Sequence, residues 1–516
     1  MSETARMRSA FIPEHVRAHA ATRPDAPAVG DLTYGRLEAW TDQVVGTLLD
    51  WGIRPGDRVA TRLGVGPEFV VVFLALMRAG AVTVPLAVSS TGWDREVLTD
   101  SPPGIVVVSA DCPSGSTGWA ASEDRRPLPP FDPSRPAQNA LRDNHIRQPE
   151  IDLDAPCYTV FTSGSSGRPK AVTQSHRAFT DLVCWMVREF RLAPPVKWAQ
   201  WASTHYDASL CEIAATLVAG GTVVPLPDEV KYDARRIVKF LAEEDVHVLQ
   251  TVPSFAREIV HALDNGSASS GLPPLSCLLL TGEPLPGNLA AALRAHLPAT
   301  RLINLYGPTE TILATWMEVP EARWSETVPV GRAIPGYRVF VVNGDDRLCD
   351  NGSVGEIVIC APSLPDGYTA GADADGAARF GPFSPPGAAE SLRCYRTGDL
   401  GRWRTDGLLE WCGRADRQIK LRGTRVEPAE IESAAIEHPA VIDCVVVGIA
   451  GTDGLVDFLV AYVAAGVNSL SAEDIREHLR RRLDADLMPS EFVVLPALPR
   501  NSGGKVDLAR LQRPVH

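Results

Sequence analysis

The segment Tyr158–Lys170 joins a short apolar stretch to a small, polar loop and a lysine. The apolar residues from Tyr158 to Phe161 predict a strand. The loop after this strand consists of Thr162, Ser163, Gly164, Ser165, Ser166 and Gly167. Backbone N–H groups, hydroxyls and the Lys170 ammonium at one place suit the binding of a triphosphate. A flexible linker is the alternative interpretation, and the Walker pattern is excluded because Gly167 is not followed by Lys and Ser or Thr.

The size and composition of the chain limit its class. Its 516 residues are too many for one hydrophobic core, so at least two domains are expected. The net charge of -13 argues against a broad nucleic-acid surface. The strongest apolar run, residues 69–77, is too short to span a bilayer, and the N-terminus lacks the apolar segment of a signal peptide. We therefore expect a cytoplasmic protein that binds neither nucleic acid nor membrane.

The ten cysteines are scattered, and none forms a C-x-x-C pair. This spacing predicts neither a metal site nor a redox site. Buried free thiols in a reducing compartment are the expected state.

Helical patterns alternate with short β-branched runs, which predicts an α/β fold with a largely parallel sheet. Such runs occur at residues 82–88, 105–108, 246–252, 277–281 and 302–305. Residues 113–156 have little apolar periodicity and predict a surface loop or connector. From residue 335 the pattern favours a β-rich subdomain. Beyond residue 413 it predicts a small α+β domain, with helices near residues 428–437 and 472–483 and strands at 441–449 and 458–463.

Polar clusters stand where several predicted strands end, and ligands of open α/β sheets bind beyond the carboxyl ends of strands. In Asn304–Glu310, Tyr306 offers a stacking face, Thr309 a hydroxyl and Glu310 an oxygen ligand for Mg²⁺. Asp399 follows a glycine turn, from which a carboxylate can accept both hydroxyls of a ribose. Ordinary turns are the alternative in each case, and for Thr281–Pro284 a turn is the simpler interpretation.

Taken in order, these clusters resemble the adenylate-forming superfamily, and more narrowly the adenylation domains of nonribosomal peptide synthetases. The stretches are YTVFTSGSSGRPKAV, HYDASL, TGEPL, NLYGPTE, YRTGDLGRW, GRADRQIKLRGTRVEPAEIE and NSGGKVDLARL, and the resemblance covers nearly the whole chain. It implies an α/β domain with a β-rich subdomain over residues 1–415 and a small mobile α+β domain over 416–516. Because no carrier-protein segment follows Lys505 and no condensation domain precedes Met1, the resemblance is to a freestanding enzyme.

By this resemblance, the substrates are Mg-ATP and an amino acid, and the aminoacyl group passes to the phosphopantetheine thiol of a separate carrier protein. Residues 162–170 are expected to hold the β- and γ-phosphates. The adenine is expected to lie among Gly282, Glu283, Asn304 and Tyr306.

The resemblance also implies roles for single residues. Thr309 would contact the α-phosphate and Glu310 would position Mg²⁺. Asp399 would accept the ribose hydroxyls, with Arg414 nearby. The remaining two roles are the hinge at Asp416 and the catalytic cation at Lys505, which would reach over the substrate carboxylate and the α-phosphate.

Asp207 is expected to pair with the amino group of the substrate, because a buried carboxylate is costly unless a cation meets it. A helix N-cap is the alternative role for Asp207. The other expected pocket residues are Ala208, Cys211, Phe255, Leu279, Thr281, Leu305, Ile312 and Leu313. This apolar lining predicts a small neutral amino acid such as alanine, glycine or serine; a larger aliphatic or a β-amino acid is the alternative.

Two other functions compete with this one. The first is an acyl- or aryl-CoA ligase of the same superfamily, against which Asp207 argues. The second is a non-catalytic regulator that binds a nucleotide or an amino acid. The sequence departs from the family pattern at Cys360–Tyr368 and at Ala87, away from the expected site of chemistry.

Overall fold

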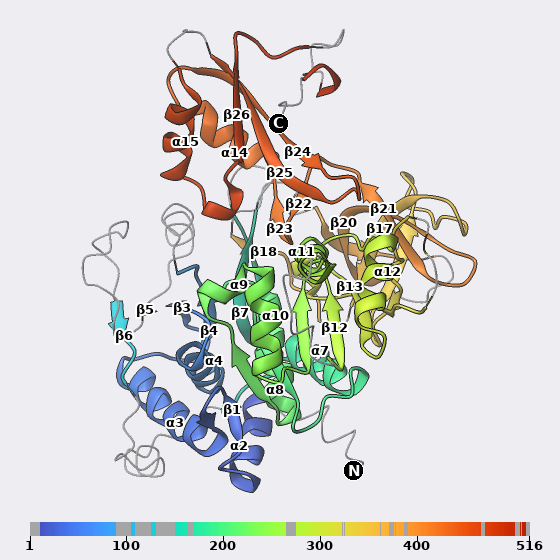
Figure 1. Cartoon of the computed structure of the whole chain (residues 1–516). Coiled ribbons are helices and arrows are strands. Elements are labelled where there is room, and N and C mark those ends of the chain that lie inside the picture. Colours follow the sequence, from blue (N-terminus) through green and yellow to red (C-terminus); the bar gives the residue numbers. More distant parts are fainter. Residues whose placement is uncertain are drawn as a thin grey trace.

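A large N-terminal domain and a small C-terminal domain build the molecule (Figure 1). The computed structural model describes residues 11–88, 105–108, 125–130, 150–163, 169–264, 275–321, 324, 326–361, 363–370, 376, 378–385, 391–465, 470–500, 506 and 508–511. Two mostly parallel sheets and a smaller antiparallel sheet form the large domain. The small domain, orange to red in Figure 1, stands over one end of these sheets. The boundary at Asp416 stays a prediction.

The first large sheet has nine strands in the order β15-β14-β13-β12-β11-β9-β10-β1-β2. Their bounds are β1 Pro27–Val29, β2 Leu32–Thr33, β9 Lys197–Gln200, β10 Thr222–Pro225, β11 Val248–Thr251, β12 Cys277–Leu280, β13 Arg301–Tyr306, β14 Thr315–Glu318 and β15 Arg332–Ala333. Strands β11, β12 and β13 are parallel, with Leu280 beside Asn304. Their carboxyl ends therefore lie at one edge of the sheet.

The second large sheet has seven strands in the order β18-β8-β7-β4-β3-β5-β6. Their bounds are β3 Arg58–Arg62, β4 Val82–Pro85, β5 Ile105–Val108, β6 Arg125–Pro127, β7 Pro156–Thr162, β8 Lys170–Ser175 and β18 Tyr368–Ala370. Strand β6 corrects one expectation, because residues 113–156 were predicted to be loop or connector. Its three residues pair with β5 in parallel, and so short a segment has no periodicity from which pairing could be predicted.

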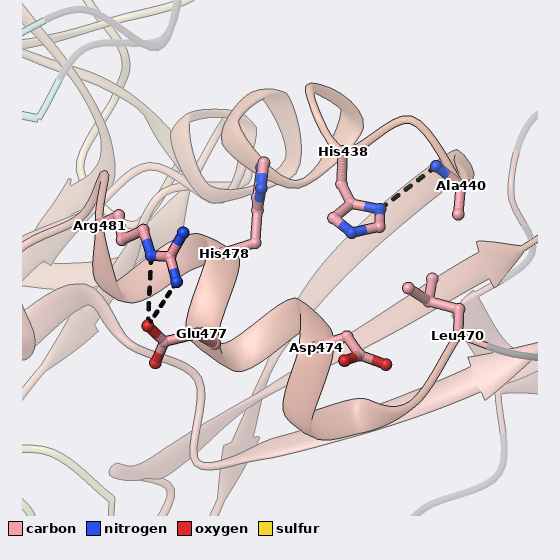
Figure 2. A pocket seen from close by; sticks show the side chains of 7 residues that line it. All are labelled: His438, Ala440, Leu470, Asp474, Glu477, His478 and Arg481. Atoms are coloured by element: carbon pink, nitrogen blue, oxygen red, sulfur yellow. Dashed lines mark hydrogen bonds and ion pairs between the residues drawn. The ribbon is translucent and has the colours of Figure 1, made fainter.

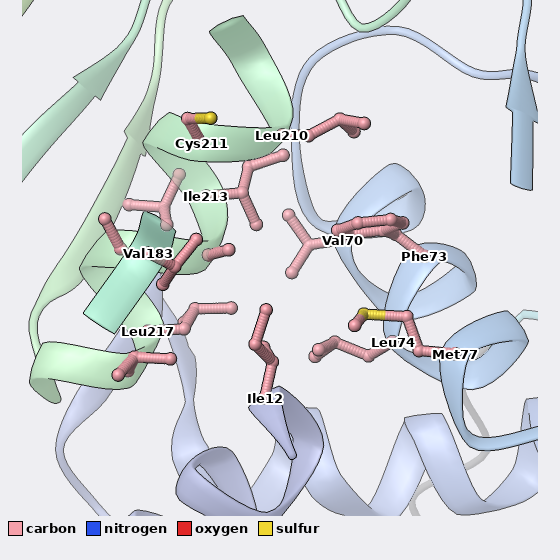
Figure 3. Packing of buried hydrophobic residues seen from close by; sticks show 14 of the residues in the cluster. Ile12, Val70, Phe73, Leu74, Met77, Val183, Leu210, Cys211, Ile213 and Leu217 are labelled. Carbon is pink, nitrogen blue, oxygen red and sulfur yellow. The ribbon is translucent and has the colours of Figure 1, made fainter. Parts of the chain in front are cut away.

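Helices packed between these sheets form the main hydrophobic core. They are α2 Ile12–Thr22, α3 Tyr34–Asp50, α4 Pro67–Ala79, α7 His176–Glu189 and α8 Asp207–Ala219. Figure 3 shows side chains of α2, α4, α7 and α8 pointing toward one another, among them Ile12, Phe73 and Leu217. Helix α8 ends at Gly220, whose φ of 75° is left-handed and favours glycine. Packing on both sides thus fixes the position of α8, which carries Asp207.

The other face of the first sheet is covered by a second cluster of buried side chains. Its helices are α10 Ala234–Glu243, α11 Pro253–Asp264 and α12 Gly287–His296, and a short helix, α9 Asp228–Lys231, precedes them. The N-terminus of α11 directly follows β11, so it begins at the same sheet edge as the strand-end clusters.

The antiparallel sheet consists of β16 Arg338–Val342, β17 Gly355–Cys360, β19 Phe380–Phe383, β20 Leu392–Trp403 and β21 Leu409–Arg414. Cys360 and Cys394 lie opposite each other on β17 and β20 and form a disulfide. The expectation that all cysteines are free thiols is therefore wrong for this pair. Sequence spacing did not reveal it, because the two residues are separated by 34 positions and meet only through strand pairing.

The small domain has its own core. Helices α14 Pro428–Ile436 and α15 Ala472–Arg480 pack on a three-stranded sheet of β24 Val441–Ala450, β25 Val456–Ala465 and β26 Glu491–Leu495. A hairpin of β22 Ile419–Leu421 and β23 Thr424–Val426 precedes this core. In Figure 1 the hairpin lies between the three-stranded sheet of the small domain and the edge of the large sheets. The two expected helices and the two expected strands are confirmed, whereas the hairpin and β26 were not predicted.

Candidate active site

The strand-end clusters converge where the two large sheets meet. The 3-10 helix η1, Thr309–Thr311, follows β13 of the first sheet. Gln174, on β8 of the second sheet, donates hydrogen bonds to the carbonyls of Thr309 and Glu310 at 3.0 and 3.2 Å. Gly307 is required in this turn, because a Cβ there would lie 2.4 Å from the Leu313 Cα. These hydrogen bonds therefore place Thr309 and Glu310 beside β8.

The phosphate-binding loop is described only at its two ends. Gly164, Ser165, Ser166 and Gly167 lie outside the described residues. Thr162 and Ser163 are buried, and the Ser163 hydroxyl donates to the Arg425 carbonyl at 2.8 Å. Lys170 is buried at the start of β8, with its ammonium 5.6 Å from the ring centre of Tyr368. The loop thus begins and ends at the same place as Glu310.

Glu310 is fully buried, and its Oε1 accepts two hydrogen bonds. The Tyr368 hydroxyl donates at 2.5 Å and the Arg425 guanidinium at 3.0 Å. The expectation that residues 360–368 lie away from the site of chemistry is therefore wrong for Tyr368, which strand pairing with β8 brings to Glu310. Burial would raise the pKa of Glu310, but Arg425 and Tyr368 outweigh it and hold the pKa at about 2. The carboxylate is therefore ionised at any pH of interest.

The second carboxylate oxygen of Glu310 fits a magnesium ion. Oε2 is buried and accepts no hydrogen bond from the described residues. Within the same residues, no three His, Cys, Asp or Glu side chains gather as a metal cage. One carboxylate together with substrate phosphates is a usual environment for Mg²⁺.

A second ionic network surrounds Asp399. Asp399 accepts hydrogen bonds from the Tyr306 hydroxyl and the Arg414 guanidinium, both at 2.7 Å. Arg414 also binds Asp416 through two nitrogens at 2.6 and 2.7 Å, and Arg379 donates to Asp416 at 3.1 Å. These arginines hold the pKa of Asp416 at about 2 despite its burial. The network joins the expected ribose carboxylate to the expected hinge.

We expect Arg414→Met to destabilise the protein by about 3–5 kcal/mol, because it leaves two carboxylates without their principal cation. Arg414 and Asp399 are each only 9% exposed. The thermal unfolding midpoint of the purified variant measures this effect. Arg402→Met is the control, since the Arg402 side chain, which pairs with Glu410, is 41% exposed. Equal midpoints for the Arg414 variant and the wild type would contradict the prediction.

Two side chains of the expected adenine site are already bound to the protein. Glu283 accepts from the Ser254 backbone at 2.8 Å, the Ser254 hydroxyl at 3.1 Å and the Gly423 backbone at 2.9 Å. The Asn304 amide donates to the Pro329 carbonyl at 2.9 Å. Both side chains support the surrounding backbone in this structure, and their contact with adenine stays a prediction.

Asp207 is the first residue of α8, and Tyr206 occupies the N-cap position. The alternative of a side-chain N-cap is therefore not what the structure shows. Burial and the Glu310 carboxylate raise the pKa of Asp207 to about 6, although hydrogen bonds from the backbone N–H groups of Ala208 and Asp207 and the charge of Lys420 oppose the rise. A carboxylate held in so unfavourable an environment gains stability from a cationic ligand.

Most of the expected pocket side chains belong to one buried cluster with α8. Cys211, Leu279, Leu305, Ile312 and Leu313 are in the main core, whereas Phe255 packs in the second cluster with its ring 5.3 Å from Trp201. Ala208 is half-buried beside Asp207, and the Thr281 backbone donates to Thr251 at 3.1 Å.

Ile312 has a φ of 61°, which is strained for a β-branched residue.

The hairpin β22–β23 brings two cations that the sequence did not assign. Lys420 lies opposite Arg425 in the hairpin. Burial, Arg425 and Arg414 lower its pKa, whereas the carboxylates of Asp399 and Glu310 raise it. Arg425 is the guanidinium bound to Glu310. The sequence signal was the run Lys420–Arg425, a glycine turn flanked by basic residues. Lys505, the expected catalytic cation, lies outside the described residues.

A hollow of about 400 Å³ on the small domain is a separate feature (Figure 2). Its polar groups already have partners: Glu477 accepts from Arg481, His438 accepts from the Ala440 backbone, and His478 contacts the Ala434 carbonyl. Its acidic and basic groups therefore do not converge on a ligand.

Comparison with known families agrees with this geometry. Residues 16–369 match the AMP-binding enzyme family, and residues 430–505 match the AMP-binding enzyme C-terminal domain. The chain therefore belongs to the AMP-binding enzymes, which are adenylate-forming ligases. Among the described residues, no helix is long and apolar enough to cross a bilayer.

Curated relatives match along nearly the whole chain. It is 31% identical over 97% of its length to the L-proline–[L-prolyl-carrier protein] ligase of Pseudomonas fluorescens, of which it covers 99%. It is 33% identical over 98% of its length to the phosphinothricin tripeptide synthetase PhsB of Streptomyces viridochromogenes. Other relatives are much longer: the chain spans 42% of PhsB and 6% of the malpinin synthetase of Mortierella alpina.

Solved structures share the fold. The holo form of PA1221, a nonribosomal peptide synthetase protein containing adenylation and PCP domains, aligns with a TM-score of 0.83 at 24% identity. That alignment covers 97% of this chain and 83% of the other. The crystal structure of IdnL1 aligns with a TM-score of 0.76 at 26% identity, covering 96% and 99% of the two chains.

Proposed function

We propose that this protein converts an amino acid and Mg-ATP into an aminoacyl-adenylate and pyrophosphate, and then transfers the aminoacyl group to the phosphopantetheine thiol of a carrier protein. The observation that carries the proposal is the convergence of Glu310, Asp399 and Asp207 on one edge of the sheets. Glu310 has a pKa of about 2, whereas that of Asp207 is about 6. The names of the relatives, which include a prolyl-carrier protein ligase, support carrier loading.

Each carboxylate has a different task. Glu310 would hold the metal ion through its unpartnered oxygen, and the ion would supply charge neutralisation at the phosphates. Asp399, oriented by Tyr306 and Arg414, would accept the ribose hydroxyls. Asp207 would bind the ammonium group of the amino acid. This contact would orient the carboxylate of the amino acid toward the α-phosphorus of ATP. Lys505 would then neutralise the negative charge shared by the two reacting groups.

The apolar residues expected to line the pocket favour a small neutral side chain. Cys211, Leu279 and Leu305 are apolar and buried, so a charged substrate side chain would be left unpaired. Alanine, glycine and serine are the proposed substrates, and a larger aliphatic or β-amino acid is the alternative. One methylene changes the binding free energy by only about 1–3 kcal/mol, so several related amino acids are expected to react.

ATP–pyrophosphate exchange across the common amino acids and several β-amino acids tests this function. The expected result is exchange that requires Mg²⁺ and is fastest with alanine, glycine or serine. Transfer to a phosphopantetheinylated carrier protein tests the second step, with free coenzyme A as the comparison acceptor. Absence of exchange with every amino acid would refute the proposed activity.

We expect kcat/KM for the amino acid to fall about tenfold per pH unit below about pH 6. Asp207 must be ionised to bind an ammonium, and its raised pKa means that it is protonated below that pH. The pH profile of pyrophosphate exchange at limiting amino acid measures the effect, and Asp207→Asn should lose it. A wild-type profile that stays flat to about pH 5 would contradict the prediction.

A further inference from the structure

Glu310 is bound by a residue of the small domain at the place where a metal ion is expected. Its Oε1 accepts from Arg425 at 3.0 Å, and Oε2 accepts no hydrogen bond from the described residues. The Arg425 side chain is 12% exposed and that of Glu310 is not exposed at all. Because the pair is buried, water screens the charges little.

A docked hairpin and a bound divalent metal ion would place like charges together. Arg425 binds Glu310, and Lys420 lies opposite Arg425 in the hairpin, so the docked hairpin brings a second cation near this single carboxylate. A divalent ion at Oε2 would add a third cation in a poorly screened site. The single negative charge of Glu310 can therefore neutralise either the metal ion or the cations of the hairpin, but not both.

Backbone hydrogen bonds fix the hairpin in this position. The Gly423 N–H donates to Glu283 at 2.9 Å, and the Arg425 carbonyl accepts from Ser163 at 2.8 Å. At Gly282 an added Cβ would lie 3.3 Å from the Gly423 Cα, so the two glycines allow a close approach. Since Ser163 begins the phosphate-binding loop, the docked hairpin contacts the first residues of that loop as well as Glu310.

A second contact holds the small domain in the same orientation without touching Glu310. Arg257, on α11, binds Asp453 at 2.7 Å and Asp457 at 2.6 Å. Asp453 and Asp457 belong to the connection between β24 and β25 and to the start of β25. This bidentate arrangement joins the two domains across a partly buried surface.

We propose that Arg425 and the divalent metal ion exclude each other at Glu310, so that the small domain takes the observed orientation only when the metal ion is absent, and that Arg257 stabilises this orientation. Arg425 is a positioning residue in this scheme. The inference rests on the proposed function, because it takes Glu310 as the metal carboxylate. It predicts that loss of the metal with pyrophosphate permits the hairpin to dock.

Metal binding without turnover tests the exclusion. Mn²⁺ is titrated by electron paramagnetic resonance into full-length protein saturated with α,β-methylene ATP. We expect Arg425→Gln to bind Mn²⁺ at least about fivefold more tightly than the wild type, because the competing cation is gone. Arg257→Ala should also tighten binding, through destabilisation of the docked orientation. Arg402→Gln, on a surface ion pair, is the control and should match the wild type.

Hydrogen exchange of residues 419–426 gives an independent measure of docking. We expect these amides to be protected in the free wild type and to lose protection when Mn²⁺ and α,β-methylene ATP are added. Unchanged Mn²⁺ affinity in Arg425→Gln, or a hairpin that stays protected at saturating Mn²⁺, would overturn the exclusion. Unchanged affinity in Arg257→Ala alone would overturn the role of Arg257.

Two further measurements keep the result interpretable. Arg425→Lys retains a cation and should lie between Arg425→Gln and the wild type, which separates charge competition from misfolding. Pyrophosphate exchange by the wild type separates the inference from the proposed function. If the wild type catalyses pyrophosphate exchange but Arg425→Gln binds Mn²⁺ as tightly as the wild type does, only the exclusion is refuted. Altered Mn²⁺ binding without exchange for any amino acid would uphold the exclusion and refute the proposed function.

Discussion

Asp207→Ala is expected to lower kcat/KM for the amino acid by about 10²- to 10³-fold. Loss of one partner from a buried charge pair costs about 2–5 kcal/mol, much of it from the unpaired partner. Here the unpaired partner would be the substrate ammonium, held among the apolar side chains that pack beside α8. Binding of ATP should change little, because Asp207 is expected to face the amino acid alone.

Asp207→Asn separates loss of charge from loss of structure. The folded-state pKa of Asp207, about 6, lies above its ordinary value of 3.8. A raised carboxyl pKa contributes stability below about pH 4, and this contribution is lost as the pH rises through about 6. At pH 7 and above, the ionised carboxylate therefore destabilises the free enzyme, by about 1–3 kcal/mol. The asparagine variant should unfold at a higher temperature there although its activity falls.

Two measurements test this prediction. They are pyrophosphate exchange at several amino acid concentrations, and thermal unfolding at about pH 7.5 and about pH 4. We expect the stability gain of Asp207→Asn at the higher pH only. An unchanged kcat/KM in Asp207→Ala would reject the role of Asp207 as the ammonium partner. Reduced activity together with reduced stability in both variants would assign Asp207 to the fold instead.

Lys505→Ala is expected to reduce adenylate formation by at least about 10³-fold. Attack of a carboxylate on the α-phosphate brings two negative groups together, and a preorganised cation at that place is among the largest electrostatic contributions to catalysis. The affinity for ATP should persist, because the residues expected to bind the nucleotide, among them Thr162 and Arg414, are unchanged.

Lys420→Ala is the matched variant, because it removes a lysine that the structure places beside Glu310 and Asp399. Since Lys420 arrives with the docked hairpin, we expect its loss to slow transfer of the aminoacyl group more than adenylate formation. Pyrophosphate exchange measures the first step, and single-turnover transfer from prepared aminoacyl-adenylate to a carrier protein measures the second. Near-normal exchange in Lys505→Ala would remove Lys505 from its proposed role.

Much of the large domain was predictable because its elements are set by local sequence. Continuous apolar runs predicted β5, β11, β12 and β13. Strands of a parallel sheet are buried on both faces and therefore consist of nearly continuous hydrophobic residues. The helices of the small domain and strands β24 and β25 followed from periodicity in the same manner. Strand β6 and the hairpin β22–β23 were missed, because three-residue strands are too short to show a period.

The sequence by itself determined the family, the order of the strand-end clusters and the residues expected to bind the substrates. These depend on short motifs in which residue type and spacing are local properties of the chain. The loop at residues 162–170 illustrates this, since its glycines, hydroxyls and lysine lie within one stretch.

Only the tertiary structure decided which distant groups meet. It pairs Cys360 with Cys394, places Phe255 against Trp201, and brings Arg425 to Glu310 across 115 positions of sequence. Strand register and domain packing set these contacts, and a pattern of neighbouring residues carries no record of either. The physical consequence is greatest at Glu310. Because this carboxylate is buried, it requires a cationic partner, and Arg425 of the small domain is that partner in this structure.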